Sequence, residues 1–225
     1  MLRLRRSLFI ALALLPLVAL SSTPLPLDGQ DAEDIARLEL TPQRPKAITI
    51  YPTGDGDLSA GSSLAKGRLY WYLPYTLENK SAKSGDFFVT VRATSDKGRR
   101  YSDLALPKVE QRIEKLEKRE FHSKSDLLTD KKKLNAYRTF APGDKLDCLA
   151  IFNPIDPEAD DIKIFVHGLV DDIRIDEMPG GGFRVTERVL ELTYERPGDE
   201  FYTSLDAFEF KGSKWTKRVI ETSSD

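Results

Sequence analysis

Apolar and polar residues alternate with a period of two along much of this chain, which is typical of β-strands that bury one face. In the segment DFFVTVRAT, residues 86–94, every second residue from Phe87 to Ala93 is apolar. The alternation recurs in residues 145–153, 161–169 and 187–195, and a closing pair of strands is expected at residues 200–210 and 214–221. Turn segments rich in glycine, proline and aspartate separate the strands. The pattern predicts an all-β protein with antiparallel sheets.

The aromatic segment GRLYWYLPYTLENKS, residues 67–81, is expected to be a strand with two different faces. The odd-numbered residues from Trp71 to Leu77 share one parity and are assigned to the core. Tyr70 and Tyr72 have the other parity. They either cover the outer side of the sheet or form an exposed platform on which a ligand stacks.

Two further features of this segment bear on its place in the fold. Pro74 has no N–H to donate to a neighbouring strand, which predicts an edge strand or a bulge. Asn79-Lys80-Ser81 matches an N-glycosylation acceptor, provided that the source glycosylates its exported proteins.

One segment has helical instead of strand periodicity. LPKVEQRIEKLEKREFHSK places Val109, Ile113 and Leu116 on one stripe, and Pro107 suits the first turn. We expect an amphipathic helix at about residues 107–121, lying on the β-structure with its charged face in solvent. The alternative of a coiled-coil partner helix is less favoured, because Glu120 interrupts the apolar seam in under two heptads.

The order of these segments resembles a known architecture. YWYLPYTLENKS is followed by FFVTVRATSDKGRRYSD and then by APGDKLDCLAIFNPIDPEADDIKIFVHGL, together residues 68–169. This succession resembles the immunoglobulin-like β-sandwiches of uncharacterised exported bacterial proteins. The resemblance implies an antiparallel sandwich with one inserted helix, and it brings no functional residue with it.

The N-terminal sequence indicates export. Three arginines precede an apolar run from Leu8 to Leu20, and small residues follow at cleavage-like spacing. We expect residues 1–22 to be a signal peptide, residues 23–45 an extended leader, and residues 46–222 a single β-sandwich domain. The apolar run is shorter than the ~20 residues that cross a bilayer. The expected location is therefore secreted or periplasmic, with no stable membrane insertion after the signal is removed.

Charge and cysteine content exclude several classes of partner. Loss of Arg3, Arg5 and Arg6 with the signal lowers the formal net charge from −2 to −5, which disfavours binding to nucleic acid. The single cysteine, Cys148, cannot form a disulfide within the chain. Its inward parity predicts a buried and unreactive thiol.

Residues for catalysis or metal binding are sparse. The chain has only two histidines, His122 and His167, and no G-x-S-x-G nucleophile motif. We therefore predict no enzyme, no catalytic residue, no cofactor and no bound metal. Carboxylates do gather in residues 55–57, 156–161 and 171–177, where calcium is the alternative to simple solvated turns.

Three functional hypotheses follow. The favoured one is an exported, non-enzymatic β-sandwich protein with a structural or protein-interaction role. The alternative is binding of a carbohydrate or cell-envelope polymer through exposed aromatic residues. The candidate ligand-binding residues are Tyr70, Tyr72, Phe88 and Phe165. A hydrolase that uses two loop carboxylates is the least favoured, because nothing in the sequence selects a pair.

Overall fold

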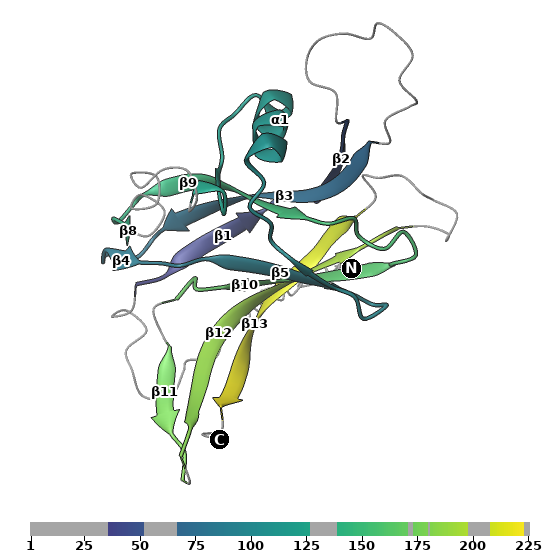
Figure 1. Cartoon of the computed structure of the whole chain (residues 1–225). Helices are drawn as coiled ribbons and strands as arrows, with labels where there is room; N and C mark the ends of the chain where they lie inside the picture. The colour runs from purple at the N-terminus through teal and green to yellow at the C-terminus, as the bar shows by residue number, and fades with distance from the viewer. Residues whose placement is uncertain are drawn as a thin grey trace, which may run out of the picture. The chain divides into compact units, whose positions relative to one another are not determined.

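The computed structural model describes residues 36–51, 67–126, 139–170, 173–179, 181–197 and 208–222. These residues form two main β-sheets, a small two-stranded sheet and one helix (Figure 1). The predicted signal peptide and the acidic segment at residues 55–57 lie outside the described residues, as do Asp171 and Asp172.

The strands are divided between the sheets as follows. The first sheet contains β1 (Leu38–Pro42), β2 (Lys46–Ile50), β3 (Arg68–Asn79), β7 (His122–Ser123) and β9 (Lys145–Phe152). The second sheet contains β5 (Thr90–Ser95), β6 (Arg100–Ser102), β10 (Asp161–His167), β11 (Arg174–Glu177), β12 (Phe183–Glu195) and β13 (Glu209–Thr222). The small sheet pairs β4 (Gly85–Asp86) with β8 (Thr139–Phe140). The pairs in both main sheets are antiparallel, except for a short parallel contact between β7 and β9.

Strand β3 lies in the middle of the first sheet. It pairs with β9 along one side and with β2 and then β1 along the other. The expected irregular leader up to residue 45 is therefore wrong for residues 38–42, which form β1. This strand belongs to the same compact unit as the other described strands. Alternation in LELTP was too short to distinguish it from an extended linker.

Of the two alternatives for Pro74, the edge strand is wrong, but the pairing is irregular opposite the proline, where residues 43–45 face residues 73–74. The carbonyl of Pro74 accepts a hydrogen bond from the N–H of Gln43 at 3.0 Å. In an antiparallel strand the nitrogen and carbonyl of one residue face the same neighbour. The missing N–H of Pro74 therefore points to the break between β1 and β2, where residues 43–45 form no strand.

The two main sheets share one hydrophobic core. The inward face of β3 contributes the odd-numbered residues from Trp71 to Leu77, which confirms their predicted parity. Strand β9 contributes Cys148 and its same-face neighbours, while β5, β10 and β12 supply the opposing layer. Trp71 also makes an edge-to-face contact with Phe208, whose ring centre lies 5.3 Å away. The coarse prediction of an all-β fold with antiparallel sheets is confirmed.

Helix α1 (Pro107–Glu117) packs on the other face of the first sheet. Val109 and Ile113 are buried there, as the helical stripe predicted, but Leu116 is 60% exposed. The helix is also shorter than the predicted 107–121, because Lys118 adopts a left-handed conformation (φ 55°) that ends it. Leu116 is consequently in the last turn, at the margin of the packed surface.

The closing pair of strands expected near the C-terminus is, in its described part, one continuous strand. β13 pairs with β12 from Glu209 to Thr222, and a bulge at Thr193/Tyr194 shifts the register without ending the pairing. β10, residues 161–167, pairs with β12 only along residues 189–195 of β12. Beyond β10, residues 183–188 of β12 pair with residues 217–222 of β13 on one side, and residues 183–186 of β12 pair with β11 on the other. We call these three segments the arm (Figure 1).

Candidate functional site

The four predicted ligand-binding residues do not form one surface. Tyr70 is 7% exposed and Tyr72 is 1% exposed, because α1 and Phe121 pack over them. A ligand platform made of these two tyrosines is therefore wrong, and their role is to cover the outer side of the sheet. Phe88 is 50% exposed and Phe165 is partly buried.

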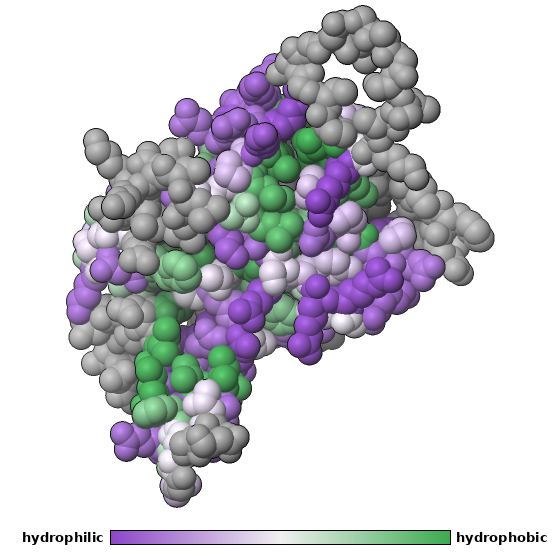
Figure 2. All heavy atoms as spheres, in the orientation of Figure 1, coloured by the Kyte–Doolittle hydropathy of each residue, from purple (hydrophilic) through white to green (hydrophobic). Residues whose placement is uncertain are grey.

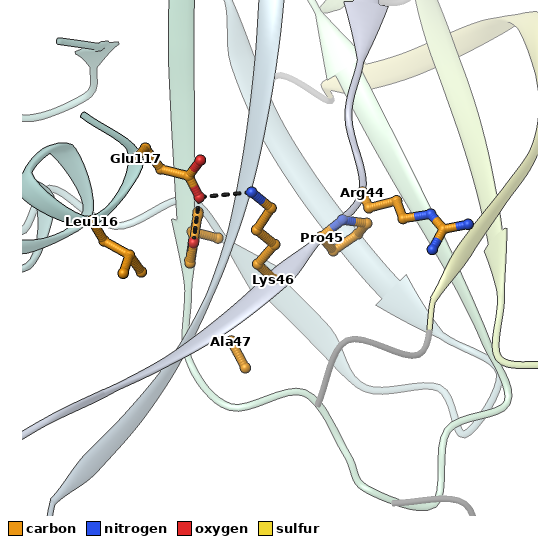
Figure 3. A pocket seen from close by; sticks show the side chains of 7 residues that line it. Arg44, Pro45, Lys46, Ala47, Leu116 and Glu117 are labelled. Carbon is orange, nitrogen blue, oxygen red and sulfur yellow. Dashed lines mark hydrogen bonds and ion pairs between the residues drawn. The ribbon is translucent and has the colours of Figure 1, made fainter. Parts of the chain in front are cut away.

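A shallow cleft of about 500 Å³ opens beside the end of α1, between the helix and β2. Its lining includes Lys46, Tyr72 and Glu117, and Figure 3 shows Lys46 and Glu117 pointing toward each other. One carboxylate oxygen of Glu117 accepts hydrogen bonds from the Lys46 ammonium and the Tyr72 hydroxyl, both at 2.7 Å. Partial burial works against ionisation, but these two donors hold the pKa of Glu117 below its usual value. These three polar side chains of the cleft thus bond to one another and attach the end of the helix to the sheet.

A buried polar cluster lies at the other end of α1, beside its first turn. Glu110 accepts a hydrogen bond from the Ser123 hydroxyl at 2.7 Å, and Asp126 accepts one from the Ser123 N–H at 3.3 Å. Burial raises the pKa of Glu110, although the hydrogen bonds from Ser123 and Ser125 oppose the rise. Glu110 and Asp126 are 6% and 3% exposed. These carboxylates lie inside the packing of the helix and are absent from the lining of the described cleft.

Asp103, which interacts electrostatically with Glu110, is a further carboxylate whose pKa is raised. It keeps some contact with solvent, but burial of its carboxyl group raises its pKa to about 7. The N–H of Ile151 donates to this carboxylate at 2.9 Å, and the Lys124 ammonium bonds to the backbone carbonyl of Asp103 at 3.0 Å. The Asp103 carboxylate thus links the segment before α1 to β9 by a hydrogen bond.

The histidines and the cysteine do not form a nucleophilic pair in the described residues. His122 Nδ1 lies 3.2 Å from an oxygen of Asp126, and His167 Nδ1 lies 3.0 Å from an oxygen of Glu187. Each ring is thus paired with a carboxylate and not with the Cys148 thiol. Cys148 is fully buried, which confirms its predicted face, and burial raises the pKa of its thiol.

Of the carboxylate clusters that suggested calcium, the structure describes residues 156–161 and 173–177. Within those residues no three histidine, cysteine, aspartate or glutamate side chains are grouped as metal ligands. Asp156 bonds to the Arg99 guanidinium at 3.0 Å and to the N–H of Glu158 at 3.1 Å. Its loop is therefore stabilised by bonds within the protein.

Asn79, the asparagine of the predicted N-glycosylation motif, has a structural role in the folded protein. Its side chain is fully buried, and its Nδ2 donates to the carbonyls of Lys83 at 2.8 Å and Phe140 at 3.0 Å. Its Oδ1 accepts from the N–H and the hydroxyl of Ser81. In the folded protein this amide is not accessible for glycosylation.

The most exposed apolar surface of the described chain lies on the arm. Ile175, Val185 and Ile220 stand in one cross-strand row, and Phe183 and Ile173 continue the same face by parity. The exposed fractions are 60% for Ile173, 63% for Ile175 and 49% for Phe183, while Val185 and Ile220 are partly exposed. We call these five residues the apolar strip. Figure 2 shows apolar side chains gathered over β11 and the neighbouring end of β12.

On the arm, the outer face of the second sheet is uncovered, unlike the outer face of the first sheet. The first sheet has α1 over its outer face, whereas no described helix or strand lies over the strip. Sequence reasoning missed this surface. The alternation in DDIRIDEM could have revealed a strand with isoleucines on one face, but not that the face is uncovered.

Comparisons of the chain with models of protein families, with characterised proteins and with solved structures returned no match. The described residues include no helix with the length and apolar character needed to span a bilayer. The described residues thus define an all-β protein of two facing sheets, with the apolar strip exposed on the arm.

Proposed function

We propose that this chain is an exported, non-enzymatic interaction protein that docks a protein partner on the apolar strip. The observation that carries the proposal is the exposure of Ile173, Ile175 and Phe183 on one continuous sheet face. Soluble proteins rarely leave contiguous apolar side chains in water unless the surface binds something. We further propose that the two facing sheets form an immunoglobulin-like sandwich, which would serve as a rigid support for the arm.

The chemistry of the strip favours a protein over a polymer. Four of its five side chains are aliphatic, so they offer no hydrogen bonds to polymer hydroxyls and no flat ring on which a sugar stacks. An apolar patch of a protein fits such a surface, because both sides lose water on contact. The strip is much smaller than the ~20–30 residues that each side of a standard stable interface uses. We therefore infer a transient partner with a small apolar patch.

A photo-crosslinking amino acid at position 183 tests this proposal, with position 184 as the matched control. Phe183 and Arg184 are neighbours on opposite faces of β12, and both are exposed. We expect a defined heterologous adduct in the exporting cell from position 183 only. The captured partner, once purified, should bind the unlabelled protein, and Phe183→Ser should weaken this binding about tenfold. Equal capture from both positions, or binding unaffected by Phe183→Ser, refutes the proposal.

Binding of an envelope polymer is a second candidate, supported by the position of Phe88 and Phe165. Phe165 stands opposite Arg92 on the outer face of the second sheet, next to Glu191 of β12. Partly exposed aromatic rings beside charged groups suit stacking on a sugar ring. Co-sedimentation with purified envelope polymers tests this candidate. Phe88→Ala and Phe165→Ala should each reduce the bound fraction, and retention unchanged in both variants would exclude this surface.

A further inference from the structure

We propose that two copies of the chain pair edge to edge through β11, antiparallel, with Ile175 of one copy opposite Ile175 of the other. β11 pairs with β12 along one edge, and among the described strands none pairs with its other edge. Such an edge presents unpaired N–H and C=O groups that a second strand can satisfy. Ile175 is also among the most exposed apolar residues described, so the contact would place the two isoleucines side by side and remove part of their surface from water.

The charge pattern of β11 is self-complementary in this one arrangement. Residues directly opposite each other in a sheet share a face, so the pairing centred on Ile175 places Arg174 of each copy against Asp176 of the other. Both side chains are exposed, and neither makes an ion pair within the described residues. Centring the pairing on Arg174 would oppose two arginines, and centring it on Asp176 would oppose two aspartates. Like charges directly opposite destabilise a sheet, so the charges select the register.

The opposite edge of the second sheet, along the whole of β13, has the opposite property. β13 carries Lys211, Lys214 and Lys217 at intervals of three residues. In an antiparallel pairing centred on Lys214, that lysine would face the same lysine of the second copy, and Lys211 would face Lys217. Lysines on an edge strand are a common protection against pairing with another molecule. The β13 edge of the sheet therefore disfavours a second copy, whereas the β11 edge accepts one.

Pairing through β11 would also enlarge the surface described above. A two-fold axis perpendicular to the sheet keeps each face on its own side, so the apolar strips of both copies would join on one continuous face. This consequence rests on the proposed function, but the pairing itself does not. Four residues per copy form a small interface, so the association should be weak and dependent on concentration.

Sedimentation velocity over a range of concentrations tests the pairing in the purified full chain. The dimer fraction should rise with concentration. Asp176→Arg gives a copy with basic residues at both positions 174 and 176 of β11, and Arg174→Asp gives a copy with acidic residues at both of these positions. Each variant alone should dimerise about tenfold more weakly or worse, because both symmetric ion pairs become repulsive. An equimolar mixture of the two should form heterodimers, since the two basic side chains of one variant then face the two acidic side chains of the other.

Lys217→Asp is the matched control, because it makes a change of charge of the same size on the opposite edge and should leave the dimer fraction unchanged. A protein that stays monomeric at every concentration overturns the proposal. So does a dimer that is indifferent to both β11 variants, a mixture that fails to associate, or a dimer lost in Lys217→Asp. These outcomes are independent of the crosslinking from position 183, so the pairing and the docking of a partner can fail separately.

Discussion

Asn79→Asp tests whether the amide of Asn79 joins the loop after β3 to strand β8, because the change replaces the amide NH2 by an oxygen and keeps the shape of the side chain. The native Nδ2 donates to the carbonyls of Lys83 and Phe140, and it is fully buried. An ionised aspartate has no hydrogen to donate, so both carbonyls lose their side-chain partner. Leaving a buried polar group unsatisfied costs ~1–3 kcal/mol. We therefore expect the free energy of unfolding at neutral pH to fall by about 4 kcal/mol, a large share of the ~5–15 kcal/mol typical of a domain.

The effect should depend on pH with a definite sign. Burial against two carbonyl oxygens would raise the pKa of the introduced carboxyl group in the folded variant above the ~3.9 of an unfolded chain. The loss should therefore be smallest at about pH 4, where a protonated carboxyl donates one hydrogen bond, and should grow as the pH rises through the folded pKa.

Urea denaturation of the parent and the variant at about pH 4.5 and about pH 7.5 measures both effects. Asn153→Asp is the matched control, because Asn153 is exposed and its substitution should change stability by less than ~0.5 kcal/mol. A loss below about 1 kcal/mol for Asn79→Asp, or a loss equal at both pH values, would refute the role assigned to this amide.

Three further predictions concern the helix, the buried acid and the thiol. Ile113→Ala should cost ~2–4 kcal/mol in urea denaturation and Leu116→Ala less than ~0.5 kcal/mol, because only Ile113 is buried; similar losses would contradict the packing of α1. Since burial raises the pKa of Asp103 to about 7, the folded state holds this proton more tightly, and stability should fall as the pH rises from about 4 to about 7. Asp103→Asn should flatten that decline. A variant with the same pH profile as the parent would contradict the raised pKa of Asp103. Cys148 should react with a thiol reagent only as fast as the protein unfolds, so rapid labelling of native protein would place the thiol elsewhere.

Local pattern was enough to assign the faces of the central strands. The period of two is a property of the extended backbone itself, so the parity of Trp71 and Cys148 could be read without knowing any neighbour. The same holds for Val109 and Ile113, whose spacing of four residues places them on one side of a helix. Boundaries were less certain. Residues 38–42 are too short for periodicity to separate a strand from a linker, and residues 209–222 form one strand across the point where a break between two strands was expected.

Sequence by itself therefore determined the all-β class, the inserted helix and the inward faces, because each depends on backbone periodicity over a few residues. Only the tertiary structure decided which outward faces are covered. Tyr72 and Ile175 both lie on outward faces, yet α1 buries the tyrosine while the isoleucine stays exposed on the arm. Burial on an outward face depends on whether an element distant in sequence packs over it, and no local pattern encodes that contact.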